Sequence, residues 1–171
     1  LNERIGAKDK AIADLSAALR FDPSHQASKD ALSRLNSASG PQQQLADEFS
    51  RLLQRTQQTA DHEQRITLAE EALKLEQKVT PWPFQATREL VKGELHFHIA
   101  GSHDRRRQGD RADNVESAIS AYEQVLAFWK LETHPRGWAQ AQHNLALAYS
   151  NRLRGDRAEN LEKAIASNQP R

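Results

Sequence analysis

The chain has 171 residues, enough for one large or two small domains, and carries 24 basic against 23 acidic residues. This balance excludes the basic excess typical of proteins that bind nucleic acid or anionic membranes, and the absence of cysteine excludes disulfides and thiolate-ligated metals. Glycine (7) and proline (6) are scarce and good helix formers dominate, which predicts an all-α protein whose amphipathic helices each bury one stripe.

The first third of the chain predicts two helices followed by a break. Leu15 and Ala18 lie on one face of a helix that ends at Asp22-Pro23, and Pro23 suits the first turn of the next helix. The residues that follow the second helix, 37–44, include Gly and Pro among polar side chains. This composition predicts a linker.

The middle of the chain predicts three further helices. Apolar residues recur at helical spacing over about 44–60 and 63–79, and the Thr-Pro-Trp-Pro sequence at 80–83 ends the second stretch. Pro83 then opens a helix that runs to about Gln108. With the helices of the last third, we expect about eight helices in all and no strand.

The strongest pattern is an internal repeat. Residues 109–119 return as residues 155–165, an offset of 46, with conservative changes. A period of this length is typical of a helical solenoid. In each block we expect Gly to end one helix in the left-handed conformation and the next Asp to cap the following helix. The repeat therefore predicts helix pairs over about 84–131 and 136–171.

These positions resemble the tetratricopeptide repeat (TPR). Ala118, Tyr122 and Val125 have the spacing of its second helix, and residues 11–18 show the same spacing near the start of the chain. The 46-residue period is longer than the usual 34. With the Trp-Ala-x-x-Gln-x-Asn-Leu sequence that begins at Trp138, it is similar to bacterial arrays often joined to caspase-like (CHAT) peptidase or signalling domains. The resemblance implies a right-handed superhelical solenoid of antiparallel helix pairs.

The same resemblance implies a domain organisation. Residues 1–36 would be the C-terminal part of one TPR-like unit with the following helix, and 37–44 the linker. The segment 45–171 would hold TPR-like repeats at about 45–80, 84–131 and 136–171, the last of them truncated. Truncated ends leave apolar helix faces uncapped, so a homodimer through the terminal helices is one expectation.

Potential catalytic or metal-binding groups are few. Glu94, His96, His98 and His103 form the one dense cluster, but His96 and His98 point about 200° apart on a helix, so three ligands do not converge. We interpret them as surface or groove histidines, with a metal site as the alternative. The run of arginines at 105–107 complements a helix dipole, with anion or nucleic-acid contact as the alternative. No phosphate-binding or nucleophile motif occurs, so we expect no metal, no cofactor and no enzymatic activity.

The first helix of each repeat in such a solenoid lines a concave surface, whose polar side chains commonly bind a peptide. We therefore expect a protein–protein interaction scaffold. The alternatives are a regulatory or sensor module of a larger CHAT-peptidase or signalling protein, and a self-association module. We expect a cytoplasmic protein that binds neither nucleic acid nor membranes. The groove candidates are Arg88, Lys92, His96 and His103 in one first helix, and Gln140, His143, Asn144 and Asn151 in the next.

Overall fold

The computed structural model describes residues 10–11, 14–20, 22, 24–37 and 40–167. All regular structure in these residues is helical, so the all-α prediction is confirmed for them. The chain divides into two compact units, residues 1–44 and 45–171. Besides helical residues at 10–11 and 14–20, the helices are α2 (Gln26–Ser37), α3 (Pro41–Gln58), α4 (His62–Glu76), α5 (Arg88–Arg105), α6 (Arg111–Phe128), α7 (Pro135–Ser150) and α8 (Arg157–Ser167).

Two predicted boundaries in the first unit have different outcomes. Residues 41–44, which we expected in a linker, form the first turn of α3, because Pro41 is preorganised for the first helical position and Gly40 accepts the Gln43 and Gln44 amides. The predicted helix boundary at Pro23 lies outside the described residues.

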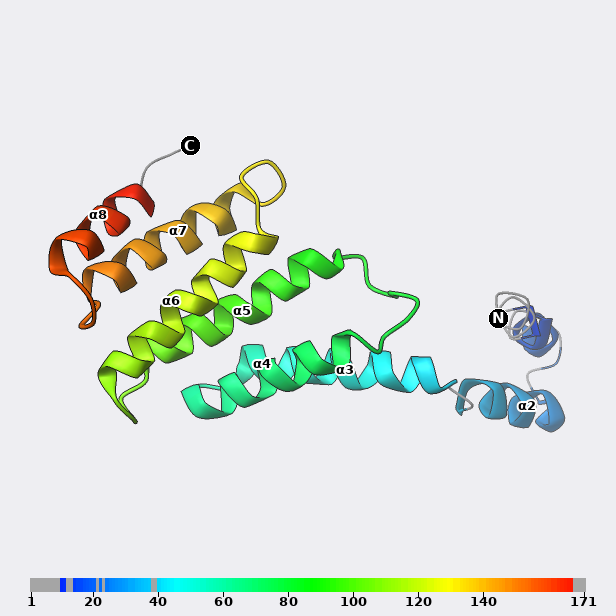
Figure 1. Ribbon diagram of the computed structural model, residues 1–171. Helices are drawn as coiled ribbons and strands as arrows, with labels where there is room; N and C mark the ends of the chain where they lie inside the picture. Colours follow the sequence, from blue (N-terminus) through cyan, green and yellow to red (C-terminus); the bar gives the residue numbers. More distant parts are fainter. Residues whose placement is uncertain (1–9, 12–13, 21, 23, 38–39, 168–171) are drawn as a thin grey trace. The chain divides into compact units, whose positions relative to one another are not determined.

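In the second unit, helices that follow one another in the chain pack together from α4 to α8 (Figure 1). Contacts between their ends show that neighbours are antiparallel. Arg88 at the start of α5 bonds Glu76 at the end of α4, and the Trp129 indole after α6 donates to the Leu90 carbonyl at the start of α5 (3.1 Å). The core between them is aliphatic and aromatic, with Phe49, Leu95 and Tyr122 among its largest buried side chains.

The connector between α5 and α6 is held by short-range contacts. Gly109 has a left-handed φ of +78°, which favours glycine. The Asn114 side chain, 5% exposed, donates to the Gln108 carbonyl at 2.8 Å, and the Asp110 carboxylate caps α6 by accepting from the Asp113 amide at 3.0 Å. Each contact recurs 46 residues later, at Gly155 (φ +79°), Asn160 with the Arg154 carbonyl (2.8 Å), and Asp156 with the Glu159 amide (3.0 Å).

The repeated connector corrects one detail of the sequence analysis. The left-handed conformation at Gly109 and Gly155 and the caps at Asp110 and Asp156 are confirmed. However, α5 ends at Arg105 and α7 at Ser150, so each glycine lies about a turn beyond its helix instead of directly terminating it. The connector is longer than predicted because the buried asparagine side chain, and not the helix, satisfies the carbonyl before the glycine.

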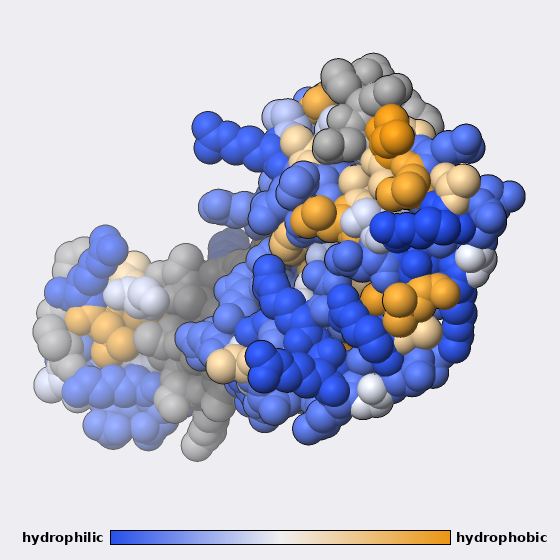
Figure 2. All heavy atoms as spheres, turned by 90° about the vertical axis from the view of Figure 1, so that its left-hand side faces the viewer, coloured by the Kyte–Doolittle hydropathy of each residue, from blue (hydrophilic) through white to orange (hydrophobic). Residues whose placement is uncertain are grey.

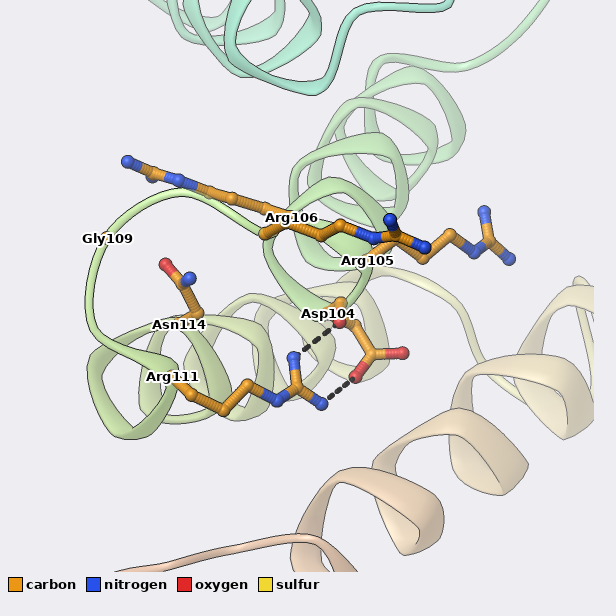
Figure 3. Close-up of a pocket in the computed structure, with 7 residues that line it drawn as sticks. Asp104, Arg105, Arg106, Gly109, Arg111 and Asn114 are labelled. Carbon is orange, nitrogen blue, oxygen red and sulfur yellow. Dashed lines mark hydrogen bonds and ion pairs between the residues drawn. The ribbon is translucent and has the colours of Figure 1, made fainter.

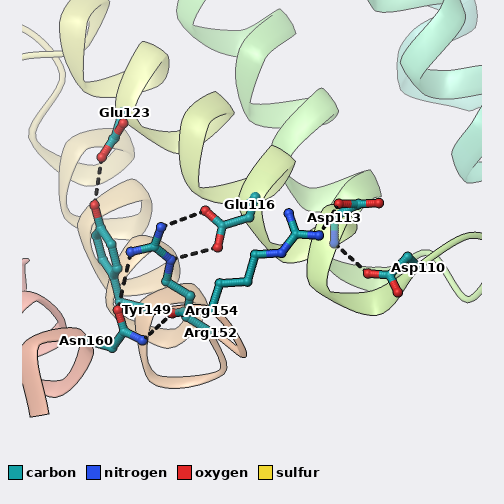
Figure 4. A network of polar contacts seen from close by, with 8 residues as sticks. All are labelled: Asp110, Asp113, Glu116, Glu123, Tyr149, Arg152, Arg154 and Asn160. Carbon is teal, nitrogen blue, oxygen red and sulfur yellow. Dashed lines mark hydrogen bonds and ion pairs between the residues drawn. The ribbon is translucent and has the colours of Figure 1, made fainter. Parts of the chain in front are cut away.

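Polar contacts join α6 to α7 and to the connector between α7 and α8 (Figure 4). Arg152 donates to both carboxylate oxygens of Glu116, at 2.7 and 2.8 Å, which lowers the pKa of Glu116. Tyr149 donates to Glu123 at 2.7 Å, and burial, together with this bond, raises the pKa of Tyr149 to about 12. These pairs tie α7 and its connector to α6, the helix before it.

Candidate binding site

The structure divides the eight groove candidates into two groups. Arg88 and Lys92 are bound to Glu76, a carboxylate of α4 that is only 1% exposed. Arg88 also donates to the Val79 carbonyl at 2.8 Å and lies over the Trp82 ring. A buried carboxylate is stable only when paired, so these two cations have a structural role in joining α4 to α5.

The two histidines of α5 among the candidates face the same way. The His96 ring stacks on Phe128 of α6, with centroids 5.7 Å apart and planes 10° apart. Burial, and then the charge of Lys92, lowers the pKa of His96. His103 lies near Glu70 of α4, and burial lowers its pKa as well. Among the described residues, no group of three histidines and carboxylates is placed to hold a metal ion.

His96 also lines a hollow of about 520 Å³ between α4 and α6, whose walls include Leu73, Ile99 and Ala121. This hollow is on the α4 side of α5. The α5 candidates therefore belong to a packed, partly apolar side of the helix.

The candidates on α7 belong to a different face. At the 46-residue repeat offset, Gln140, Asn144 and Asn151 correspond to Glu94, His98 and Arg105, which form a second polar stripe on α5. At about 100° per residue, this second stripe lies on roughly the opposite side of α5 from Arg88, Lys92 and His96. The structure thus does not bring the two groups of candidates together.

The second stripe of α5 contacts α3. Gln57, in the last turn of α3, donates to a Glu94 carboxylate oxygen at 2.8 Å, and His98 Nε2 lies 3.9 Å from the same oxygen. His98 and Gln57 stabilise the charged carboxylate and so lower the pKa of Glu94. All three side chains are at least partly exposed, so these groups remain accessible to a partner.

Tyr122 of α6 is a core residue whose hydroxyl lies close to Arg105 of this stripe. Its side chain is 2% exposed, and burial raises its pKa to about 12, an effect that nearby Asn144 of α7 partly offsets. A methyl group at Gly101 would contact both the Tyr122 hydroxyl and the Arg105 guanidinium at 3.8 Å. Three successive helices therefore contribute polar groups to one place.

We call the resulting surface the α5/α7 face. It comprises Gln57, Glu94, His98, Arg105, the Tyr122 hydroxyl, Gln140, Asn144 and Asn151. His143 lies at its margin: it is exposed, whereas its counterpart Phe97 packs edge-on against Tyr122 at 5.9 Å.

Sequence reasoning missed part of this surface. Gln57 was not a candidate, Glu94 was weighed only as a metal ligand, and Tyr122 was taken as a core residue. A signal for Glu94, His98 and Arg105 was present, because the repeat offset maps the three α7 candidates onto them. Only the Tyr122 hydroxyl required the structure, since the residue is buried as predicted and packing alone brings its hydroxyl close to Arg105.

Apolar side chains are also exposed at α8. Leu153, Leu161 and Ile165 are 68%, 40% and 61% exposed. Figure 2 shows apolar patches separated by hydrophilic side chains on this side of the molecule. The repeat counterparts of Leu161 and Ile165 are Val115 and Ile119, which are only 1% and 5% exposed.

Within the described residues, no helix combines the length and apolar character needed to cross a membrane. In comparisons with known proteins, no family model and no curated protein match the sequence, and no solved structure matches the fold.

Proposed function

We propose that residues 45–171 form a TPR-like right-handed solenoid and that the α5/α7 face is the concave surface on which it binds an extended or helical segment of a partner protein. The observation that carries this proposal is the shared register of polar residues on α5 and α7. Glu94, His98 and Arg105 recur as Gln140, Asn144 and Asn151 at the repeat offset, while the neighbouring Leu95 and Ala141 are both buried.

A row of donors and acceptors at matching repeat positions of α5 and α7 suits recognition of a peptide. Carboxylate, imidazole, guanidinium and amide groups alternate along it, so both the backbone and the side chains of a bound segment would find partners. These side chains do not pair with a buried carboxylate of the described residues, unlike Arg88 and Lys92, which are bound to the buried Glu76 carboxylate.

The first helix pair departs from a regular array. Gln57 in the last turn of α3 meets Glu94 in the second turn of α5, so α3 is displaced along α5 compared with an exact repeat. The regular register belongs to α5–α8, and we propose that the partner contacts α5 and α7 first.

The test is capture of partners on immobilised protein from lysate of the source cell, with two matched variants. His143→Glu with Asn144→Glu adds two negative charges to the α5/α7 face and its margin. Ser120→Glu with Gln124→Glu adds the same charge to the hollow between α4 and α6. Circular dichroism would establish that both variants are folded.

Loss of a partner only in the His143/Asn144 variant would support the proposal. Loss only in the Ser120/Gln124 variant would move the site to the α4 side of α5. A partner that ignores both changes, or no specific partner at all, would refute binding on the α5/α7 face.

Self-association is the second candidate, favoured by the exposure of Leu161 and Ile165 where their repeat counterparts are buried. Light scattering over a range of concentrations tests it. If α8 mediates a dimer, Ile165→Asp would yield a monomer. A wild-type protein that stays monomeric at all concentrations would exclude this candidate.

A further inference from the structure

The two connectors share their backbone contacts but differ in their arginines. In the second connector, Arg152 binds Glu116, Arg154 binds Asp113 at 2.6 Å, and Arg157 donates to the Ser150 carbonyl. Every arginine there thus has an acceptor within the fold. These contacts fasten the connector to the helices beside it.

The first connector has two arginines that form no ion pair within the described fold, in addition to two arginines that do. Arg106 binds Glu63, and Arg111 binds both the carbonyl and the carboxylate of Asp104 (Figure 3). Arg105 and Arg107 are exposed and form no ion pair with any described residue. The repeat places Asn151 and Leu153 at the equivalent positions, so this connector geometry does not need two cations there.

Arg105 and Arg107 border two adjoining hollows. One, of about 350 Å³, is also lined by Gly109 and Arg111, and the other, of about 240 Å³, by His62. Most nearby carboxylates already have a partner, since Asp104 and Glu63 are paired with arginines and Asp61 caps α4 through the Gln64 amide at 2.7 Å. The two free guanidinium groups therefore lack a matching anion within the described fold.

Arg105 also belongs to the α5/α7 face, beside Tyr122. We infer that Arg105 and Arg107 bind carboxylate side chains of the partner segment, so that the protein recognises an acidic peptide whose negative charges lie at the connector end of the α5/α7 face. This inference rests on the proposed function. Guanidinium groups pair with carboxylates through parallel hydrogen bonds, which gives them a role in specificity as well as attraction.

The experiment selects binders from a random peptide library displayed on phage. It compares the wild type, Arg105→Gln with Arg107→Gln, and a control, Arg55→Gln with Arg136→Gln, which removes the same charge from other exposed positions. The best wild-type peptide is then synthesised, and its affinity for all three proteins is measured by fluorescence anisotropy, with and without inorganic phosphate as competitor.

We expect wild-type binders enriched in Asp and Glu, and an affinity loss of about tenfold or more for Arg105→Gln with Arg107→Gln but not for the control. Selected peptides without acidic enrichment, or equal losses in both variants, would overturn the inference and leave the proposed function standing. Displacement of the peptide from the wild type by inorganic phosphate, but not by chloride at equal ionic strength, would also overturn it, because the site would then be one for phosphate. Failure to select any peptide would overturn both.

Discussion

Two glycines of α5 should respond in opposite directions to the same substitution. Alanine raises helix stability by about 1 kcal/mol relative to glycine at an interior position. At Gly101 a methyl group would make only ordinary contacts, the nearest at 3.8 Å, so Gly101→Ala should stabilise the protein by up to about 1 kcal/mol. At Gly93 the methyl group would overlap the indole of Trp129, which is 7% exposed and hydrogen-bonded to Leu90.

The magnitude at Gly93 follows from what Trp129 must give up. Displacing the indole costs its hydrogen bond, about 1 kcal/mol, and introduces packing strain of about 2 kcal/mol against Phe97 and its other neighbours. After the helix gain of about 1 kcal/mol, Gly93→Ala should destabilise the protein by about 2 kcal/mol. The two variants should thus differ by about 3 kcal/mol although they lie two turns apart in one helix.

Urea denaturation followed by far-ultraviolet circular dichroism and by tryptophan fluorescence measures both values. Gly93→Ala should also change the fluorescence of the folded state, since it moves an indole. If Gly93→Ala proved as stable as Gly101→Ala, the close packing of Trp129 on α5 would be wrong, and with it the arrangement of α5 and α6.

Three further outcomes are expected. Glu76→Ala should cost about 3 kcal/mol in urea denaturation, because it leaves two cations without their buried partner, whereas Glu70→Ala at an exposed site should change stability by less than about 0.5 kcal/mol. The lowered pKa of Glu116 contributes stability that is present above the unfolded pKa of this residue and is lost as the pH falls through the folded pKa. Glu116→Gln should therefore reduce the loss of stability between neutral and acidic pH. The effect should be well under about 1 kcal/mol, because the pair with Arg152 is partly exposed. Tyr122 and Tyr149, the two tyrosines of the chain, should show no phenolate absorbance near pH 10 while the protein is folded. Their raised pKa values of about 12 add stability below pH 10, which is lost as the pH rises toward 12. A titration midpoint at pH 10 in the folded protein would contradict the burial of both rings.

The sequence by itself determined most of the helices and much of the connector chemistry, although α5 begins at Arg88 after the Thr87 cap and not at Pro83 as expected. Apolar spacing, the aspartate caps and the positive-φ glycines act within a few residues, so their effect does not depend on the rest of the fold. For the same reason the offset between residues 109–119 and 155–165 predicted two connectors with matching contacts. The start of α3 was misplaced because Gly and Pro also mark linkers, and here Pro41 opens the helix instead.

Only the tertiary structure decided which face of each helix is available to a partner. Several faces of α5 carry polar residues, and periodicity alone does not say which of them meets α4. The buried Glu76 sets the rotation of α5 by binding Arg88 and Lys92, and the contact of Trp129 with Gly93 brings α6 against another side. These contacts join residues far apart in the chain, so helix rotation, and with it the composition of the α5/α7 face, follows from packing and not from local sequence.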